Sequence, residues 1–299
     1  MSRYLVTGGS GRLGRSVVSV LVDAGHDVVS VDRHPLSDSP AEHRDCDLSD
    51  TAATTALIAE VRPDAIVHLA AIAVPFGRPD LELFTTNTTL AFNVLTASLA
   101  AGVRSVLFAS SPTVIGYGAP HGWKPAYLPI DEEHPLAPWN AYALSKQSVE
   151  NLVSMAVRAH GDRIAVGAFR PCYVIAPEEW EGAPTQQGHT VLDRLADPAL
   201  SAVALFNYVD ARDVGEFVLA WLRRAREIPN GSVFFVGAPD ALARSSVAEL
   251  ADRYRPELLD AAGGLVGSSS VFSSERAERL LGWRASRTWR TQLALEDIS

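Results

Sequence analysis

Three glycines near the N-terminus, spaced as Thr-Gly-x-x-Gly-x-x-Gly over residues 7–14, constrain the fold more than any other feature of the chain. The preceding run Tyr4-Leu5-Val6 is short and apolar, which favours a buried strand, and residues 12–24 have helical periodicity. A glycine turn between a strand and a helix lets the backbone approach a pyrophosphate and points a helix N-terminus at its charge. The sequence therefore predicts a dinucleotide site built on Gly8, Gly11 and Gly14.

A second predicted strand, residues 28–31, ends at Asp32. An acidic residue about 20 positions beyond the glycines is placed to accept both hydroxyls of an adenosine ribose. A carboxylate there repels a 2′-phosphate, so Asp32 favours NAD, although Arg33 beside it is compatible with NADP. The alternative for this whole segment is a tight turn between strand and helix that binds no ligand.

Charge and cysteine content exclude several classes of protein. The 299 residues carry a net charge of −9, from 26 basic and 35 acidic residues, with no basic run, which argues against nucleic-acid and membrane partners. Cys46 and Cys172 are too few and too far apart for a disulfide framework, so we expect a cytoplasmic chain with free thiols. No apolar run approaches 18 residues, and the eight histidines form no close ligand pair, so no metal is expected.

Strand-like and helix-like segments alternate along the first 171 residues. Strands are predicted at 65–71, 106–111 and 164–169, with a short third strand or its end at 45–48, and helices are predicted at 50–60, 81–101 and 141–160. This alternation predicts an α/β fold, a doubly wound and mostly parallel sheet of the Rossmann type. His68, inside an apolar strand, is expected to be a core histidine.

Beyond residue 177 the alternation degrades, although a strand is predicted at 203–209 and a helix at 211–226. We expect a smaller mixed α/β lobe that binds the substrate. The predicted dinucleotide-binding domain covers residues 1–172 and 208–228, and the predicted C-terminal substrate lobe covers 173–207 and 229–299.

Ser111, Tyr142 and Lys146 are the predicted catalytic residues. Tyr142 and Lys146 are four residues apart on a predicted helix and share one face, while Ser111 ends a predicted buried strand. A lysine ammonium and an oxidised nicotinamide ring together favour tyrosinate, which lowers the phenol's pKa from about 10. A serine hydroxyl binds the developing oxyanion, so the set suits hydride transfer between an alcohol and a carbonyl.

The scarcity of lysine supports this assignment. Of the 26 basic residues only Lys124 and Lys146 are lysine, and arginine cannot replace a lysine that acts as a compact ammonium. The alternative for Tyr142 and Lys146 is an ordinary pair on a helix surface.

Five segments occur in the order of known family motifs: Thr7–Gly14, Val67–Ala71, Ser110–Gly116, Tyr142–Lys146 and Tyr208–Val214. Together they resemble the extended short-chain dehydrogenases/reductases of the NAD-dependent epimerase/dehydratase family, over about residues 3–225. The resemblance implies an enzyme that uses NAD and forms a homodimer through the helices predicted at 81–101 and 141–160. The cofactor-binding residues expected on these grounds are Gly8, Gly11, Arg12, Leu13, Gly14, Asp32, Arg33, Asp47, Leu48, Leu69, Ala70, Ala71, Asn87, Ser110, Tyr142, Lys146, Pro171, Cys172 and Tyr173.

Two segments depart from the pattern of nucleotide-sugar enzymes in this family. Those enzymes commonly follow the sixth strand with R-x-x-N-x-Y-G-P, whereas residues 170–177 read R-P-C-Y-V-I-A-P, so Tyr173 replaces an asparagine that helps hold the diphosphate. They also commonly carry arginine before the Tyr-Val-Asp segment, where this chain has Leu205-Phe206-Asn207. An apolar pair cannot neutralise a diphosphate. Arg194 or Arg287 would have to serve instead.

The residues expected to contact substrate are Ser111, Pro112, Thr113, Trp123 and Tyr173. Trp123 lies in a predicted loop and would stack on a sugar ring, or else only pack within its lobe. The segments around Ser111 and Arg170 are also similar to those of uronate dehydrogenases, which bind a free sugar acid.

Three functions remain open from the sequence. The main hypothesis is an NAD(P)-dependent oxidoreductase that acts on a secondary alcohol or carbonyl of a small sugar-like or polyol substrate. The alternative is a UDP- or TDP-sugar 4-epimerase or dehydratase, in which the hydride leaves and returns within one turnover. The third, a non-catalytic NAD(P)-sensing protein, is disfavoured by the complete set of Ser111, Tyr142 and Lys146.

Overall fold

The computed structural model describes residues 1–293, apart from the side chains of residues 262–264. The chain divides into two compact units. The first comprises Met1–Val114, Pro138–Arg170 and Gly215–Val233, and the second comprises Ile115–Ala137, Pro171–Val214 and Phe234–Ser299. Residues 294–299 of the predicted C-terminal lobe lie outside the described residues. No helix within the described part of the chain is long and apolar enough to cross a membrane.

A seven-stranded sheet organises the fold, with strands in the order β3 (Glu42–Arg44), β2 (Asp27–Val31), β1 (Arg3–Thr7), β4 (Ala65–His68), β5 (Ser105–Ala109), β6 (Ala165–Pro171) and β9 (Val233–Val236). The pairings from β3 through to β6 are all parallel. Strand order reverses beside β1, which is the arrangement of a doubly wound sheet. The predicted α/β fold class is confirmed.

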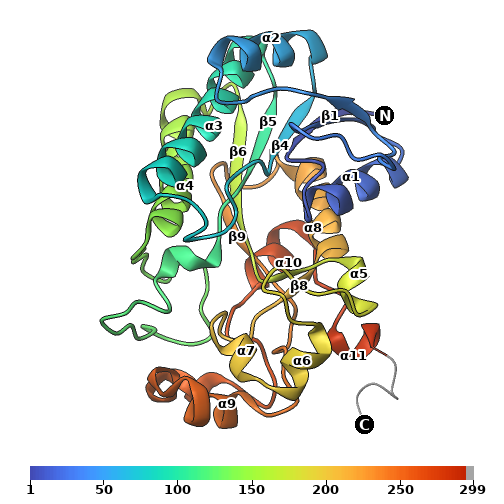
Figure 1. Cartoon of the computed structure of the whole chain (residues 1–299). Helices are drawn as coiled ribbons and strands as arrows, with labels where there is room; N and C mark the ends of the chain where they lie inside the picture. The colour runs from blue at the N-terminus through green and yellow to red at the C-terminus, as the bar shows by residue number, and fades with distance from the viewer. Residues whose placement is uncertain (294–299) are drawn as a thin grey trace. The chain divides into compact units, whose positions relative to one another are not determined.

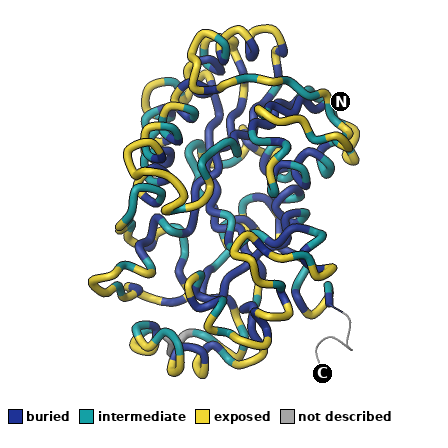
Figure 2. Tube along the Cα trace, in the orientation of Figure 1, coloured by how far each residue is buried: buried dark blue, intermediate teal, exposed yellow. Residues whose placement is uncertain are grey.

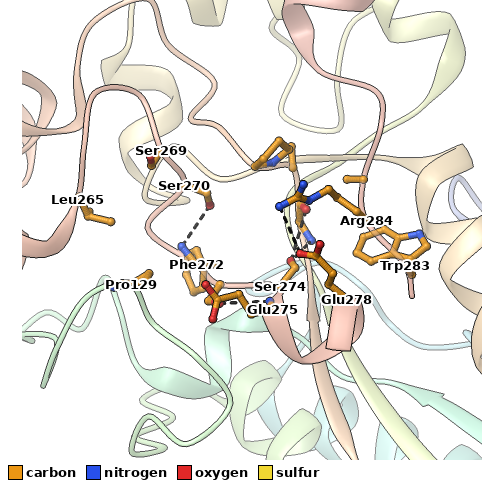
Figure 3. Close-up of a pocket in the computed structure, with 15 residues that line it drawn as sticks. Pro129, Leu265, Ser269, Ser270, Phe272, Ser274, Glu275, Glu278, Trp283 and Arg284 are labelled. Atoms are coloured by element: carbon orange, nitrogen blue, oxygen red, sulfur yellow. Dashed lines mark hydrogen bonds and ion pairs between the residues drawn. The ribbon is translucent and has the colours of Figure 1, made fainter. Parts of the chain in front are cut away.

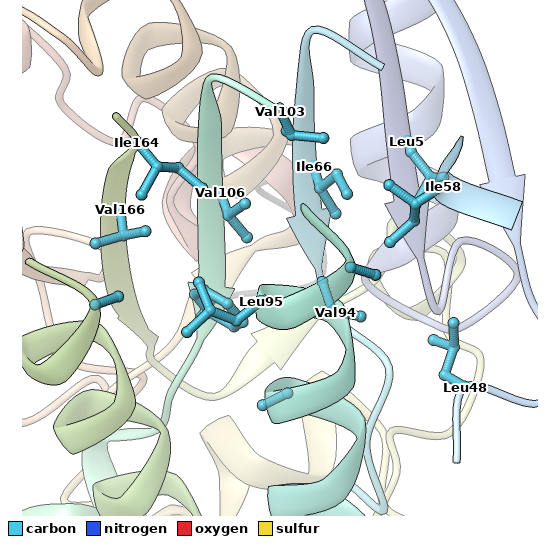
Figure 4. Packing of buried hydrophobic residues seen from close by; sticks show 14 of the residues in the cluster. Leu5, Leu48, Ile58, Ile66, Val94, Leu95, Val103, Val106, Ile164 and Val166 are labelled. Carbon is cyan, nitrogen blue, oxygen red and sulfur yellow. The ribbon is translucent and has the colours of Figure 1, made fainter. Parts of the chain in front are cut away.

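Helices cover both faces of this sheet in the first unit (Figure 1). One face carries α1 (Gly14–Asp23) and α8 (Ala211–Arg224), and the other carries α2 (Thr51–Val61), α3 (Asp80–Ala101) and α4 (Ala141–His160). The inner strands β1, β2, β4, β5 and β6 are largely apolar because both faces of the sheet are covered. Figure 2 shows them buried, and Figure 4 shows aliphatic side chains of strands and helices packed together, among them Leu5, Ile58, Ile66, Leu95 and Val106.

Local capping residues set the helix ends close to where the sequence predicts them. Asp50 precedes α2 and its carboxylate accepts from the backbone N–H groups of Ala52 and Ala53 at 2.8 and 3.0 Å. Asn140 precedes α4 and accepts from the N–H of Ala143 at 2.9 Å. Gly102 ends α3 with a φ of 72°, a left-handed conformation that favours glycine.

The second unit is built from short elements. It contains the parallel pair β7 (Val174–Ile175) and β8 (Val209–Asp210), the helices α5 (Pro177–Trp180), α6 (Val191–Ala196), α7 (Ala199–Ala202), α9 (Val247–Tyr254), α10 (Glu275–Leu281) and α11 (Trp289–Gln292), and the 3₁₀ segment η2 (Pro256–Gly264). Trp180, Tyr208 and Trp289 are among the residues that form its core.

Two predicted strands are wrong. The strand predicted at 203–209 is reduced to β8, because Leu205 and Phe206 adopt φ values of 51° and 60° and turn the chain. Both side chains are fully buried. The apolar residues of this segment therefore belong to a buried turn and not to a strand. The third strand, predicted around residues 45–48, instead lies at Glu42–Arg44, a polar edge strand with no apolar run to reveal it.

Candidate functional site

The glycine turn joins β1 to α1 through close backbone contacts. Gly8 has a φ of +71°, and a Cβ added to it would lie 2.8 Å from the backbone nitrogen of Ala70. A Cβ on Gly14 would lie 2.0 Å from the carbonyl oxygen of Gly8. The side chain of Leu13 does not cap α1, so the N-terminus of this ten-residue helix is suited to an anion. The turn therefore fits the pyrophosphate of NAD.

The residues expected around the adenosine follow β2 and β3. The Asp32 carboxylate accepts from the N–H groups of Ser10 and His34 at 3.3 and 3.4 Å, which ties it to the glycine turn. Asp47 accepts from the backbone and the hydroxyl of Ser49, and these hydrogen bonds lower the pKa of its carboxyl. Leu48 is buried.

His68 ends β4 as a neutral, buried histidine. Its Nδ1 lies 2.8 Å from the Thr7 hydroxyl, which also accepts from the N–H of Ala70 at 3.3 Å. Burial, together with the charge of Lys146, lowers the pKa of His68 to about 3. Its role as a core histidine is confirmed, and the Thr7 hydroxyl links it to the segment Leu69–Ala71 that is predicted to contact the cofactor.

Ser111, Tyr142 and Lys146 come together where β5 ends beside the first two turns of α4. The side chain of Ser111 is hydrogen-bonded to Tyr142. Thr113 donates to the Ser111 hydroxyl oxygen from its backbone N–H at 3.3 Å and from its own hydroxyl at 2.9 Å. Because Ser111 accepts from Thr113, its single hydroxyl hydrogen is available for donation to the Tyr142 oxygen. Thr113, predicted to contact substrate, thus orients the serine.

Lys146 is buried, and its Nζ donates to the carbonyl oxygen of Ala109 at 2.9 Å. The same atom lies 5.8 Å from the centroid of the Tyr142 ring. Burial lowers the pKa of Lys146 to about 8.

The sequence predicts that the pKa of Tyr142 is lowered. With the charges of the protein alone, this prediction is wrong. Burial raises the pKa of Tyr142, and the opposing effect of the Ser111 hydrogen bond is smaller. The physical reason is that the lysine ammonium bonds the Ala109 carbonyl instead of the phenol, while removal from water disfavours tyrosinate.

Asn87, expected to contact the cofactor, is buried within α3. Its amide accepts from the N–H of Ile72 at 2.8 Å and donates to the Ile72 carbonyl at 3.2 Å and to the Ser145 hydroxyl at 3.1 Å. It therefore joins the segment after β4 to helix α4, and its contact with NAD stays a prediction.

Two charged residues that the sequence analysis did not single out are buried beside this site. Glu150 lies two turns after Tyr142 on α4, and Arg170 belongs to β6. The pair is bidentate, and Glu150 also accepts from Ser110. Glu150 could have been found from the sequence, because Tyr142, Lys146 and Glu150 follow one another at four-residue spacing along one helix face.

Three further predicted site residues, Trp123, Cys172 and Tyr173, belong to the second unit, whereas Arg12, Arg33 and Pro112 belong to the first. Trp123 donates its indole N–H to the Ile115 carbonyl at 2.8 Å and packs edge-on against Tyr117. Cys172 is buried, which raises the pKa of its thiol. The ring of Tyr173 lies 4.5 Å beneath the guanidinium of Arg194. Their contacts with cofactor or substrate stay predictions.

The second unit also contains a cavity of about 360 Å³ (Figure 3). Its lining combines serine hydroxyls with apolar side chains such as Phe272 and Trp283. Arg284 pairs with Glu278 at 3.3 Å, and Ser270 accepts from the N–H of Phe272 at 3.1 Å. None of the predicted site residues lines this cavity.

Comparisons with known proteins show the family of the chain. Residues 4–237 match the NAD dependent epimerase/dehydratase family. The chain is 24% identical to the UDP-glucose 4-epimerase of Lactobacillus helveticus over 94% of this chain and 92% of the relative. It is 33% identical to the UDP-glucose 4-epimerase of Azospirillum brasilense, over 55% of this chain and 47% of that relative.

A solved structure with a similar fold is a short-chain dehydrogenase/reductase superfamily protein from Agrobacterium tumefaciens with bound NAD. It has a TM-score of 0.73 and 25% sequence identity, and the match covers 97% of this chain and 94% of that one. With the family match spanning most of the chain, the fold shared and the glycine turn fitting NAD, the protein is an NAD-dependent enzyme of the epimerase/dehydratase family.

Proposed function

We propose that the protein catalyses hydride transfer at a secondary alcohol of a sugar-like substrate, with Ser111, Tyr142 and Lys146 as its catalytic residues. The observation that carries the proposal is the hydrogen-bonded Ser111–Tyr142 pair with Lys146 one helical turn away. The three side chains come from the end of β5 and the start of α4, the edge of a parallel sheet at which ligands bind.

Each side chain has a distinct task in this reaction. Tyr142 takes the proton of the substrate hydroxyl and returns one to the product oxygen. Ser111, oriented by Thr113, donates a hydrogen bond to that oxygen as its negative charge develops. Lys146 would hold the ribose of NAD and would keep a positive charge near the phenol. Bound NAD⁺ supplies the hydride acceptor and a further positive charge.

We propose 4-epimerisation of a nucleotide sugar as the net reaction. This proposal is supported by relatives named UDP-glucose 4-epimerase, one of which aligns over more than nine-tenths of both chains. In a 4-epimerisation the sugar is oxidised and reduced again within one turnover, so no reduced cofactor would accumulate. The second unit would then hold the nucleotide.

Net oxidation of a free sugar is a second candidate, favoured by two arginines in the second unit. Arg287 pairs with the fully buried Asp213, whose carboxylate also accepts from the Arg287 N–H at 2.8 Å. Arg194 is buried, donates to the Leu200 carbonyl at 2.8 Å and stacks on Tyr173. Both guanidinium groups are engaged inside the unit, and Leu205 is buried where nucleotide-sugar enzymes commonly carry arginine. This arrangement favours a substrate without a diphosphate.

One experiment separates the two candidates. The purified protein is incubated with NAD and either UDP-glucose or a panel of free sugars and sugar acids. Conversion of UDP-glucose to its 4-epimer without NADH accumulation supports the epimerase. Stoichiometric NADH with a free sugar supports the dehydrogenase, and failure of both substrate classes contradicts the proposed function.

We also propose that the protein is a homodimer formed through α3 and α4. Both helices carry large apolar side chains that are about half exposed or more, including Leu81, Phe92 and Leu144. Exposed apolar side chains on neighbouring helices are typical of a surface that another chain covers.

A further inference from the structure

Helix α4 contacts the end of β5 through one stripe of side chains, Tyr142, Lys146 and Glu150, each four residues after the last. Tyr142 hydrogen-bonds Ser111. Lys146 donates to the carbonyl of Ala109 at 2.9 Å. Glu150 Oε1 accepts from the hydroxyl of Ser110 at 2.6 Å. Three consecutive residues at the strand end are thus each tied to one residue of the helix.

Glu150 is itself held by Arg170 of β6. The guanidinium donates from Nε to Oε1 and from Nη2 to Oε2, both at 2.8 Å. The two side chains are only 7% and 2% exposed. Two parallel hydrogen bonds fix the plane of the carboxylate, which sets the direction in which it accepts from Ser110. The backbone N–H of Ser110 also donates to the Phe169 carbonyl of β6 at 2.7 Å.

We propose that Glu150 and Arg170 are positioning residues for hydride transfer. Their buried pair holds Ser110, and Ser110 fixes the adjacent Ser111 against Tyr142. The inference rests on the proposed function, because it concerns the geometry of the same catalytic residues. Neither Glu150 nor Arg170 touches the reacting atoms.

The energetics of buried charge favour this role over a purely stabilising one. Removing two charges from water costs free energy that their attraction offsets only in part, so a buried ion pair is weak evidence for stability. Apolar side chains of similar volume would fill the same space. They would not accept the Ser110 hydroxyl, which is the contact that the carboxylate alone supplies.

Two variants test the inference. Ser110→Ala removes the tether and leaves the ion pair, and Glu150→Met combined with Arg170→Met replaces the pair with apolar side chains. In both variants we expect kcat to fall about tenfold to hundredfold, because small displacements of reacting groups are costly. The substrate KM is expected to stay within about twofold, since the loss arises from misalignment in the transition state. The double variant should unfold near the wild-type temperature.

Arg104→Met is the matched control, because Arg104 forms an ion pair with Asp64 at the opposite end of β5. It should leave kcat unchanged. A double variant with both wild-type stability and wild-type kcat would overturn the inference, as would a Ser110→Ala variant as fast as wild type.

Wild-type turnover in the same assay tests the proposed function separately. If the wild type shows none, crystal structures of wild type and Ser110→Ala decide the inference. Loss of the Ser111–Tyr142 hydrogen bond in the variant supports it, and an unchanged hydrogen bond contradicts it.

Discussion

The Nζ of Lys146 lies 5.8 Å from the centroid of the Tyr142 ring, but its hydrogen bond goes to the Ala109 carbonyl. Burial away from water favours the neutral form of both side chains: it lowers the pKa of Lys146 to about 8 and raises the pKa of Tyr142. Only a further positive charge near the phenol reverses this tendency. We therefore expect Tyr142, the proposed base, to ionise more readily when an oxidised cofactor is bound.

Replacement of Tyr142 by phenylalanine removes the proposed acid/base and leaves the ring in place. We expect kcat to fall by about 10²–10⁴, the usual contribution of a positioned acid or base, with NAD affinity changed much less. The measurement is steady-state kinetics combined with NAD titration. Tyr127→Phe is the control, because that exposed tyrosine donates to Asp131 in the second unit. Equal activity of Tyr142→Phe and wild type on every substrate would instead favour an NAD-sensing protein.

Lys146→Met is expected to abolish turnover and to stabilise the fold at neutral pH. A buried ammonium whose pKa drops from 10.5 to about 8 opposes folding by about 3 kcal/mol. Loss of the hydrogen bond to Ala109 offsets about 1 kcal/mol of the gain.

The stability advantage of Lys146→Met decreases as pH rises through a defined window. Below the folded pKa of about 8, lysine is protonated in both states and the cost of burying its charge is complete. Between about 8 and 10.5 the unfolded lysine binds more protons than the folded one, so wild-type stability rises with pH. Chemical denaturation of both proteins should show the advantage of Lys146→Met shrinking across this window. An advantage that is independent of pH would contradict the assignment.

The sequence predicts the parts of the fold that rest on local rules. Apolar runs locate the central strands, and helical periodicity places the helices predicted at 50–60, 81–101 and 141–160 within one residue of α2, α3 and α4. It misses β3, where a polar edge strand lacks an apolar pattern, and misplaces the strand at 203–209, where Leu205 and Phe206 fill the core from a turn.

In the candidate site, too, the features that depend on local sequence were predicted and those that depend on tertiary packing were not. The spacing of Tyr142 and Lys146 is local information, so the structure places both beside Ser111 as expected. The buried pair of Glu150 and Arg170 joins residues 20 apart in the chain, and a single sequence gives no register between a helix and a distant strand. The direction in which the pKa of Tyr142 shifts depends on how deeply the side chain is buried, and the neighbouring residues in the sequence do not predict that burial.

Asp32→Ala is expected to weaken NAD use and improve NADP use. The carboxylate is tied to the glycine turn through the Ser10 N–H, where it would accept the ribose hydroxyls and repel a 2′-phosphate. We expect the ratio of kcat/KM for NAD over NADP to fall about tenfold or more, since two hydrogen bonds to a charged group are lost. Asp23→Ala, at the exposed end of α1, should leave the ratio unchanged. An unchanged ratio in the Asp32 variant would place the ribose elsewhere.

Gly14→Ala is expected to open the glycine turn. The new Cβ would lie 2.0 Å from the Gly8 carbonyl oxygen and 2.7 Å from the Gly9 Cα, and neither backbone atom moves without displacing the turn. We expect a loss of stability of about 1–3 kcal/mol together with loss of NAD binding. Thermal unfolding with and without NAD measures both effects. Gly77→Ala is the matched control, because its Cβ meets nothing closer than 3.7 Å.

Phe92→Glu and Leu144→Glu test the proposed dimer. These side chains are 54% and 46% exposed on α3 and α4, helices that pack against each other in the first unit. A carboxylate buried in an apolar interface without a partner is costly, so each variant is expected to be monomeric while keeping its fold. Light scattering coupled to size-exclusion chromatography measures the mass. Leu259→Glu, at a 42% exposed leucine of the second unit, should remain dimeric, because α3 and α4 are then untouched. A monomeric wild-type protein would contradict the proposal, and dissociation of the Leu259 variant alone would move the interface to the second unit.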